Sequence, residues 1–239
     1  VKAGVFLIAR FWPVLSGTDL YTVLVTSVGL VTMTFGAWVA LFRHDLKGIL
    51  AYSTISQLSY IVLGAVMLTP MAMVGGIIHI AAHALSKITL FFCAGSIYCA
   101  SRRKKISDLA GIGRKLPWTM VAFFIGSLGM IGVPPTGGFI SKWYLVIGSV
   151  DAGEMVFLAV LLVSSVLNAA YFLPVTYTAF FEKEKANPAG DGADADAVVP
   201  DDIREIPLVT IPLMATAILS LVMGVYPGYF LTLAGGVVP

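Results

Sequence analysis

Three protonatable side chains repeat every four residues along one apolar stretch of the sequence. The stretch reads IIHIAAHALSKITLFF, residues 77–92, and it carries His79, His83 and Lys87. On an α-helix such residues share one face, about 6 Å apart along the axis. That spacing is too wide for direct hydrogen bonds at every step, but waters between the groups would complete a chain. Because histidine titrates near neutral pH and a desolvated lysine gives up its proton more readily, the row predicts a proton relay.

A metal site and plain packing are the alternatives for this row. Two histidines four residues apart need a third metal ligand, the stretch contains no Asp or Glu, and Cys93 lies off this face. We therefore expect no metal site, and we interpret Cys93 and Cys99 as small buried hydrophobic residues. A lone histidine in an apolar helix is more often a packing residue, but two in line with a lysine favour function.

Two further lysines, Lys2 and Lys142, also fall inside apolar segments. A lysine at mid-membrane costs roughly 2.5–3.5 kcal/mol, so such residues are retained for a reason. Near the end of a span the long stem can carry the ammonium to the surface. This alternative is open for Lys2, and for Lys142 beside the interfacial residue types Trp143 and Tyr144. Lys87 lies midway along its span, where the stem reaches neither surface.

The segment GMIGVPPTGGFISKWYL, residues 129–145, predicts a broken helix. Pro134 and Pro135 remove two backbone donors, and Gly137 and Gly138 loosen the chain that follows. Irregular backbone at membrane depth is tolerated only when it is buried in protein or lines a wet cavity, and in transporters it often marks the transport site. The two expected half-helices cover residues 116–133 and 136–150.

The segment RHDLKGILAYSTISQLSYI, residues 43–61, places a polar patch inside an apolar span. Small hydroxyl residues in membrane spans often mediate helix packing, and a hydrated path for proton uptake is the functional alternative. Composition leaves both interpretations open. The candidate uptake residues are Asp45, Lys47, Ser53, Thr54, Ser56 and Gln57.

The composition indicates a membrane protein, since 58% of the residues are hydrophobic and 12% are charged. Soluble domains are nearer 45–50% apolar and about 25% charged. We predict an all-α, polytopic transmembrane bundle of about seven helices, one of them broken. The expected spans are residues 1–14, 20–42, 48–69, 70–100, 116–149, 155–181 and 206–234.

The basic residues outside the spans gather on one side of this arrangement, with Arg10 as the exception. They occupy the loops 43–47, 101–115 and 182–205, which the positive-inside rule makes cytoplasmic. We therefore expect a multi-pass protein of the inner (plasma) membrane with its C-terminus outside. Residues 1–181 would form the proton-conducting membrane domain, 182–205 a solvated linker, and 206–239 a last transmembrane helix.

Three stretches together resemble one family. DLKGILAYSTISQLSY, HIAAHALSKITLFFCAGS and GVPPTGGFISKWYL are similar to the signatures of proton-conducting antiporter-like membrane subunits. These occur in respiratory complex I, in membrane-bound hydrogenases and as the A and D subunits of Mrp-type Na⁺/H⁺ antiporters. The resemblance implies two inverted repeats of transmembrane helices, each with one broken helix. This chain is similar to the second half of that fold, so we expect it to be part of a longer protein.

The resemblance also implies roles for individual residues. Lys2 takes the position of a lysine that joins two half-channels, and His79, His83 and Lys87 take that of the central relay. Lys142 matches the last relay position before the outer side. The family's lysine on the first broken helix and its partner glutamate have no counterpart in this sequence, which would explain a basic row with no carboxylate.

Three functions follow from the resemblance. The first is proton translocation as a subunit of a multisubunit monovalent cation/proton antiporter, most similar to the Mrp D subunit. The second is the same channel serving complex I, an NADH:quinone oxidoreductase, or a membrane-bound hydrogenase; the third is a scaffold that translocates nothing. The expected partners are other membrane subunits, the bilayer and protons, with Na⁺ as a candidate coupled cation. We expect no cofactor, no redox centre and no nucleic acid partner.

Overall fold

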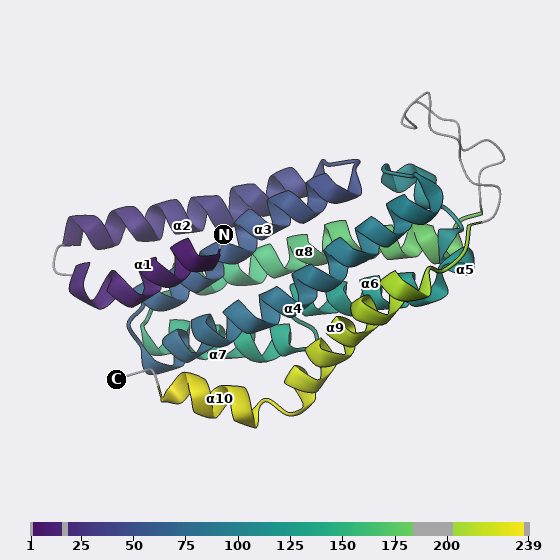
Figure 1. Ribbon diagram of the computed structural model, residues 1–239. Coiled ribbons are helices and arrows are strands. Elements are labelled where there is room, and N and C mark those ends of the chain that lie inside the picture. Colours follow the sequence, from purple (N-terminus) through teal and green to yellow (C-terminus); the bar gives the residue numbers. More distant parts are fainter. Residues whose placement is uncertain (1, 16–18, 184–202, 237–239) are drawn as a thin grey trace.

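The computed structural model describes residues 2–15, 19–183 and 203–236, and Figure 1 shows their arrangement. These residues form helices and no β-strand, which confirms the predicted all-α class. Most of the predicted linker lies outside the described residues. The elements are α1 (Lys2–Leu15), α2 (Asp19–Leu41), α3 (Leu46–Val66), α4 (Pro70–Ser101), the 3-10 helix η1 (Ile106–Leu109), α5 (Ile112–Lys115), α6 (Pro117–Ile131), α7 (Gly137–Asp151), α8 (Met155–Phe181), α9 (Pro207–Val225) and α10 (Gly228–Gly235).

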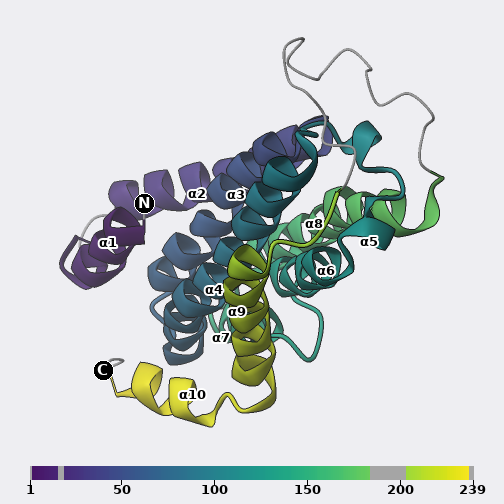
Figure 2. The ribbon, with the colours of Figure 1, turned by 45° about the vertical axis from the view of Figure 1, so that its right-hand side comes forward.

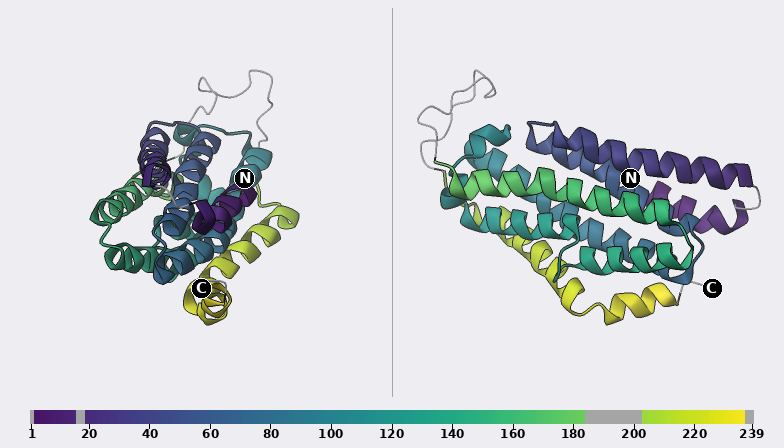
Figure 3. Two further views of the ribbon diagram at one scale, coloured as in Figure 1. Left: turned by 90° about the vertical axis from the view of Figure 1, so that its left-hand side faces the viewer. Right: turned by 180° about the vertical axis from the view of Figure 1, so that it is seen from behind.

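Helix α4 is the centre of the bundle. It packs against α3, α6, α7 and α9 (Figures 1 and 2), while α2 lies on α3 and α8. Figure 3 shows α8 running along the back of the molecule beside α2 and α6. The outward faces of α2, α8 and α9 carry exposed apolar side chains such as Val31, Val166 and Leu208. Since exposed apolar faces of this length suit lipid, the arrangement is that of a transmembrane bundle.

Five helices within the described residues are long and apolar enough to cross a membrane, namely Val23–Leu41, Leu46–Val66, Pro70–Ser101, Met155–Phe181 and Pro207–Val225. The first four agree with the predicted spans, and the fifth ends before the predicted last span does. Helices α6 and α7 are shorter, because they are the two halves of one interrupted span.

The predicted break separates α6 from α7. Helix α6 ends where Gly132 adopts a left-handed conformation with φ 88°, and α7 begins at Gly137. Pro134 and Pro135 cannot continue the hydrogen-bond ladder of α6 because neither has an N–H. The two half-helices are therefore confirmed, with bounds within one or two residues of those expected.

Two of the loops that carry basic residues, between α2 and α3 and between α4 and η1, meet at one end of the bundle (Figure 1). Asp45 and Lys105 form an antiparallel bridge between the α2–α3 and α4–η1 loops. Glu205, which precedes α9, accepts hydrogen bonds from the backbone N–H and the hydroxyl of Thr119 at 3.0 and 2.8 Å. The short elements η1 and α5 were not predicted, because about one turn of helix each leaves no periodic pattern in a polar loop.

Two predictions need correction. The expected last span, residues 206–234, is divided: α9 ends at Val225, and α10 turns away from it (Figure 2). The cause is Pro227, which disfavours the helical conformation at Tyr226, where φ is −122° and ψ is 66°. The second correction concerns the cysteines, because Cys93 is buried but Cys99 is exposed.

Candidate functional site

The basic row of α4 lies inside the protein, as its spacing predicts. His79, His83 and Lys87 are 1%, 3% and 5% exposed. The two imidazole rings stack with centroids 6.0 Å apart and planes 13° apart. The ring of Tyr60, from α3, stacks on the other side of His79 at 5.3 Å. His79 is thus held between two rings, while neither nitrogen of His83 has a hydrogen-bond partner among the described residues.

Lys87 is bound by α3. Its Nζ donates to the backbone oxygen of Leu50 at 2.6 Å and to the Ser53 hydroxyl at 2.5 Å. Both partners are neutral, so within the described residues the ammonium is held without a carboxylate. Ser53, predicted on the uptake path, is therefore in direct contact with Lys87.

Lys142 reaches the break itself. Its Nζ donates to the backbone oxygens of Met130 and Ile131 at 3.0 and 2.9 Å, and to the Ser165 hydroxyl at 3.1 Å. In a continuous helix these two oxygens would accept from the N–H groups four residues later. Those residues are Pro134 and Pro135, which have no N–H, so the proline pair leaves free the two carbonyls that the ammonium binds.

The surroundings of Lys142 suit a cation for two more reasons. The carboxyl end of α6 carries the partial negative charge of its helix dipole. The ammonium also lies 4.8 Å from the centre of the Tyr60 ring, within the range of a cation–π interaction. Lys142 is 5% exposed, so its side chain lies inside the protein and not on the outer surface of the bundle.

Gln57 connects the α4 row with the break. Its side-chain Nε2 donates to the Met130 oxygen at 3.2 Å, and its Oε1 lies 3.0 Å from Nε2 of His79. The same Met130 oxygen also accepts from Lys142. Although Gln57 was predicted on the uptake path, the structure places it at the junction between the two lysine sites.

The remaining candidate uptake residues have other contacts. Ser56 donates to a backbone oxygen of α2 at 2.7 Å, and Thr54 donates to its own helix at 2.7 Å. Asp45 caps α3 by accepting from a backbone N–H at 2.6 Å, and Lys47 lies exposed near it. Ser56 and Thr54 thus serve packing and local bonding, so an uptake route through the whole set stays a prediction.

Lys2 lies at the amino end of α1, which packs against α3. Its side chain is half-buried. Its predicted role as a junction stays a prediction.

The charges along the row oppose one another. His79 and Lys87 are eight residues apart, about 12 Å along the helix axis. Two unit charges at that distance repel by about 1.4 kcal/mol at an effective dielectric constant of about 20, which corresponds to a tenfold change in a proton equilibrium. Each proton on the row therefore weakens the binding of the next.

Sequence reasoning missed several members of this network. Asn168, on α8, donates to the Met130 oxygen at 3.5 Å and accepts from the Tyr171 hydroxyl. An amide inside an apolar span is a detectable signal, because polar residues there are costly. Ser141 lies 2.8 Å from Nδ1 of His79, but a serine beside Lys142 gives no comparable signal in the sequence.

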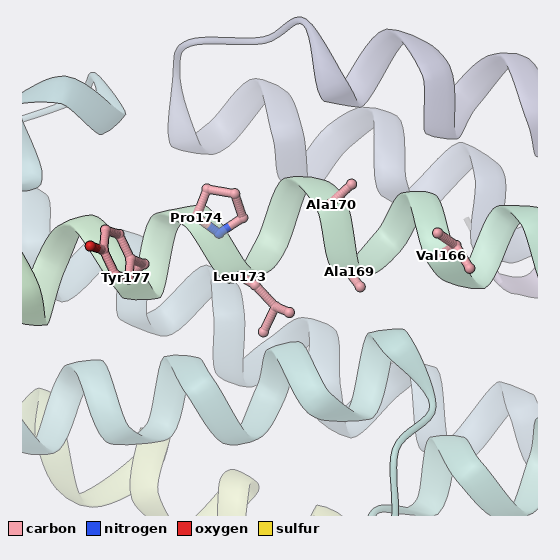
Figure 4. Close-up of a pocket in the computed structure, with 6 residues that line it drawn as sticks. All are labelled: Val166, Ala169, Ala170, Leu173, Pro174 and Tyr177. Carbon is pink, nitrogen blue, oxygen red and sulfur yellow. The ribbon is translucent and has the colours of Figure 1, made fainter.

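An apolar groove on the outer face of α8 is separate from this network (Figure 4). Its lining offers almost no polar groups, unlike the buried polar network around Lys87 and Lys142. The residues that line it are Val166, Ala169, Ala170, Leu173, Pro174 and Tyr177.

Comparison with known proteins gives one consistent family. The profile described as "NADH:quinone oxidoreductase/Mrp antiporter, TM" matches residues 1–168. NADH-quinone oxidoreductase subunit N of Desulforudis audaxviator is 44% identical over 80% of this chain and 37% of its own length. A probable K⁺/H⁺ antiporter subunit of Rhizobium meliloti is 44% identical over 59% of this chain and 14% of its own length.

The fold is also found in a solved structure. A chain of the Mrp complex from Dietzia sp. superposes with a TM-score of 0.85 at 24% identity, covering 97% of this chain and 49% of that one. The chain thus spans about half, or less, of the length of these relatives.

Proposed function

Since the chain belongs to the NADH:quinone oxidoreductase/Mrp antiporter transmembrane family, we propose that it translocates protons as a subunit of a multisubunit monovalent cation/proton antiporter. One observation carries the proposal: two buried ammonium groups, on Lys87 and Lys142, bond only to neutral oxygens within the described residues. A structural lysine at membrane depth would be expected to pair with a carboxylate. A lysine held by neutral oxygens is able to lose its proton without leaving an unpaired anion.

The proposed route follows the network. A proton enters at the end of the bundle where α3 begins, reaches Lys87 beside Ser53, and passes along α4 through His83 and His79. It then moves to Lys142 at the break and leaves toward the opposite end. Waters fill the steps between side chains, because the helical spacing exceeds a direct hydrogen bond.

We further propose the sidedness of this route. The loops 43–47, 101–115 and 182–205 would be cytoplasmic in the plasma membrane, with the C-terminus outside, as the positive-inside rule indicates. Lys2 would connect the route to a preceding half-channel in the longer protein. Na⁺ remains the candidate coupled cation, and the other membrane subunits of the complex are the proposed partners.

The test uses the complete complex in everted membrane vesicles. We expect Lys87→Ala and Lys142→Ala each to abolish proton translocation while the complex still assembles on a native gel. Lys183→Ala is the control, because Lys183 is exposed outside the spans. Wild-type translocation by both variants would contradict the proposal. Full coupling after His79, His83 and Lys87 are all made apolar would establish the scaffold role instead.

A proton channel within a respiratory NADH:quinone oxidoreductase is the second candidate. It is favoured by the similarity to subunit N of such an enzyme, which extends over 80% of this chain. Mass spectrometry of the gently extracted native complex separates the two. Small membrane subunits as the sole partners would support the antiporter, and partners that carry iron–sulfur or flavin groups would support the oxidoreductase.

A further inference from the structure

The two ring nitrogens of His79 have different partners. Nε2 lies 3.0 Å from Oε1 of Gln57, and Nδ1 lies 2.8 Å from the hydroxyl oxygen of Ser141. The imidazole is 1% exposed and is held between the rings of Tyr60 and His83. Because bulk solvent does not reach it, these neighbours decide which nitrogen carries the proton.

The contact with Gln57 determines whether Nε2 of His79 carries a hydrogen. A backbone carbonyl can only accept a hydrogen bond, so the Gln57 group that faces the Met130 oxygen at 3.2 Å must be its NH₂. The amide oxygen of Gln57 then faces His79, and it can only accept. Nε2 of His79 must therefore carry a hydrogen in both charge states, and Nδ1 is the nitrogen that gains and loses the proton.

The Ser141 side has two arrangements. Its hydroxyl has one hydrogen and two acceptors in reach, Nδ1 of His79 at 2.8 Å and the backbone oxygen of Gly138 at 3.0 Å. When His79 is neutral, the hydroxyl donates to Nδ1. When His79 is protonated, Nδ1–H donates to the hydroxyl oxygen, and the hydroxyl hydrogen turns to Gly138.

We propose that Ser141 passes protons to and from Nδ1 of His79, with Gln57 as the positioning residue that keeps the hydrogen on Nε2. This inference rests on the proposed proton translocation. In the forward step the N–H bond at Nδ1 breaks as an O–H bond forms on Ser141, and the original hydroxyl hydrogen of Ser141 passes to a water on the way to Lys142. Two protons each shift to a neighbouring atom, one net positive charge leaves His79, and no electrons are transferred.

The competing direct route from His79 to Lys142 runs through Gln57 and the Met130 oxygen. Its contacts are short, at 3.0, 3.2 and 3.0 Å. Neither an amide nor a carbonyl gains or loses protons near neutral pH, so this series of hydrogen bonds holds the groups in place but does not conduct protons. Ser141 immediately precedes Lys142 on α7, and its hydroxyl can both accept and donate a proton. The proposed proton path from His79 to Lys142 therefore runs through Ser141.

The first experiment locates the hydrogen. The sequence contains three histidines, His44, His79 and His83, so the complete complex labelled with ¹⁵N-histidine gives few imidazole signals from this chain. Single replacement of each histidine assigns them. We expect neutral His79 to carry its hydrogen on Nε2, and Gln57→Met, similar in volume but without the amide, to lose that preference. A hydrogen on Nδ1 of neutral wild-type His79 would overturn the inference.

The second experiment measures proton flux. We expect Ser141→Ala to lower translocation about tenfold or more and to change its solvent isotope effect, while Ser141→Thr restores most of the flux. Ser149→Ala is the matched control, since Ser149 lies buried on the same helix and donates only to the backbone oxygen of Leu145. Wild-type flux in Ser141→Ala, with Lys87→Ala inactive, would refute the Ser141 step alone. Wild-type flux in Lys87→Ala as well would refute the proposed translocation.

Discussion

Replacing Gly138 by alanine should uncouple the two half-helices at the break. A Cβ at position 138 would lie 1.8 Å from the backbone oxygen of Gly129 and 2.8 Å from its carbonyl carbon. Ordinary contacts begin at 3.4 Å, so the first turn of α7 would have to retreat from α6 by about 1.6 Å (3.4 − 1.8). No side-chain rotation can relieve the contact, because the obstructing atoms are backbone.

That retreat acts on Lys142, one turn further along α7. Its bonds to the Met130 and Ile131 oxygens are 3.0 and 2.9 Å, and about 1.6 Å more exceeds any hydrogen bond. Hydrogen bonds to a charged group contribute about 1.5–3 kcal/mol each, so losing both would weaken the ammonium site by about 3–6 kcal/mol. The flexible lysine stem can restore part of these hydrogen bonds. We therefore expect a loss near the lower end of this range, which corresponds to a proton flux about 100-fold below that of the wild type.

The assay is dye-monitored proton translocation in everted vesicles, with assembly checked on a native gel. Gly95→Ala is the matched control, because Gly95 lies on α4 and a Cβ there would meet nothing within 4 Å. Assembled Gly138→Ala complexes that translocate within about twofold of wild type would refute this account of the break, as would an equal loss in Gly95→Ala.

Two other predictions concern the ends of α3 and α4. Asp45→Ala should lower the free energy of unfolding by about 1 kcal/mol, because α3 loses its N-terminal cap, whereas Asp45→Asn should retain most of that stability. A urea titration of the purified complex compares both variants with the wild type, and equal stability of all three proteins would contradict the capping role. A maleimide added to native membranes should modify Cys99 and leave Cys93 intact, because Cys93 is buried and its thiol is hydrogen-bonded to the Thr119 oxygen. Mass spectrometry detects the adduct, and modification of Cys93 would contradict the packing of α4 against α6.

The features that could be predicted from the sequence are those that depend on local chemistry. The shared face of His79, His83 and Lys87 follows from helical periodicity, and the break follows from the missing N–H groups of Pro134 and Pro135. The division after Val225 depends on an equally local rule, the effect of a proline on the preceding residue, and could have been predicted as well.

The contacts that join these features depend on tertiary packing, which one sequence does not show. Gln57 shares a polar segment with Ser56 and Thr54, and composition does not distinguish the residue that reaches His79 from those that bond to α2 or to their own helix. Asn168 approaches the break from another helix, far away in sequence. The sequence also does not show which backbone oxygens bind a lysine, because every residue has a backbone oxygen.

The use of backbone oxygens has a consequence for how this protein tolerates genetic change. A lysine paired with an aspartate loses its partner through a single codon change at that aspartate, whereas any amino acid at position 130 or 131 still supplies a carbonyl. The positions most sensitive to mutation are therefore Pro134 and Pro135. Replacing either proline would introduce a backbone N–H that could compete with the Lys142 ammonium for those oxygens. In a mutational scan, the ligand positions of Lys142 should accept many side chains of suitable size, and the proline pair few.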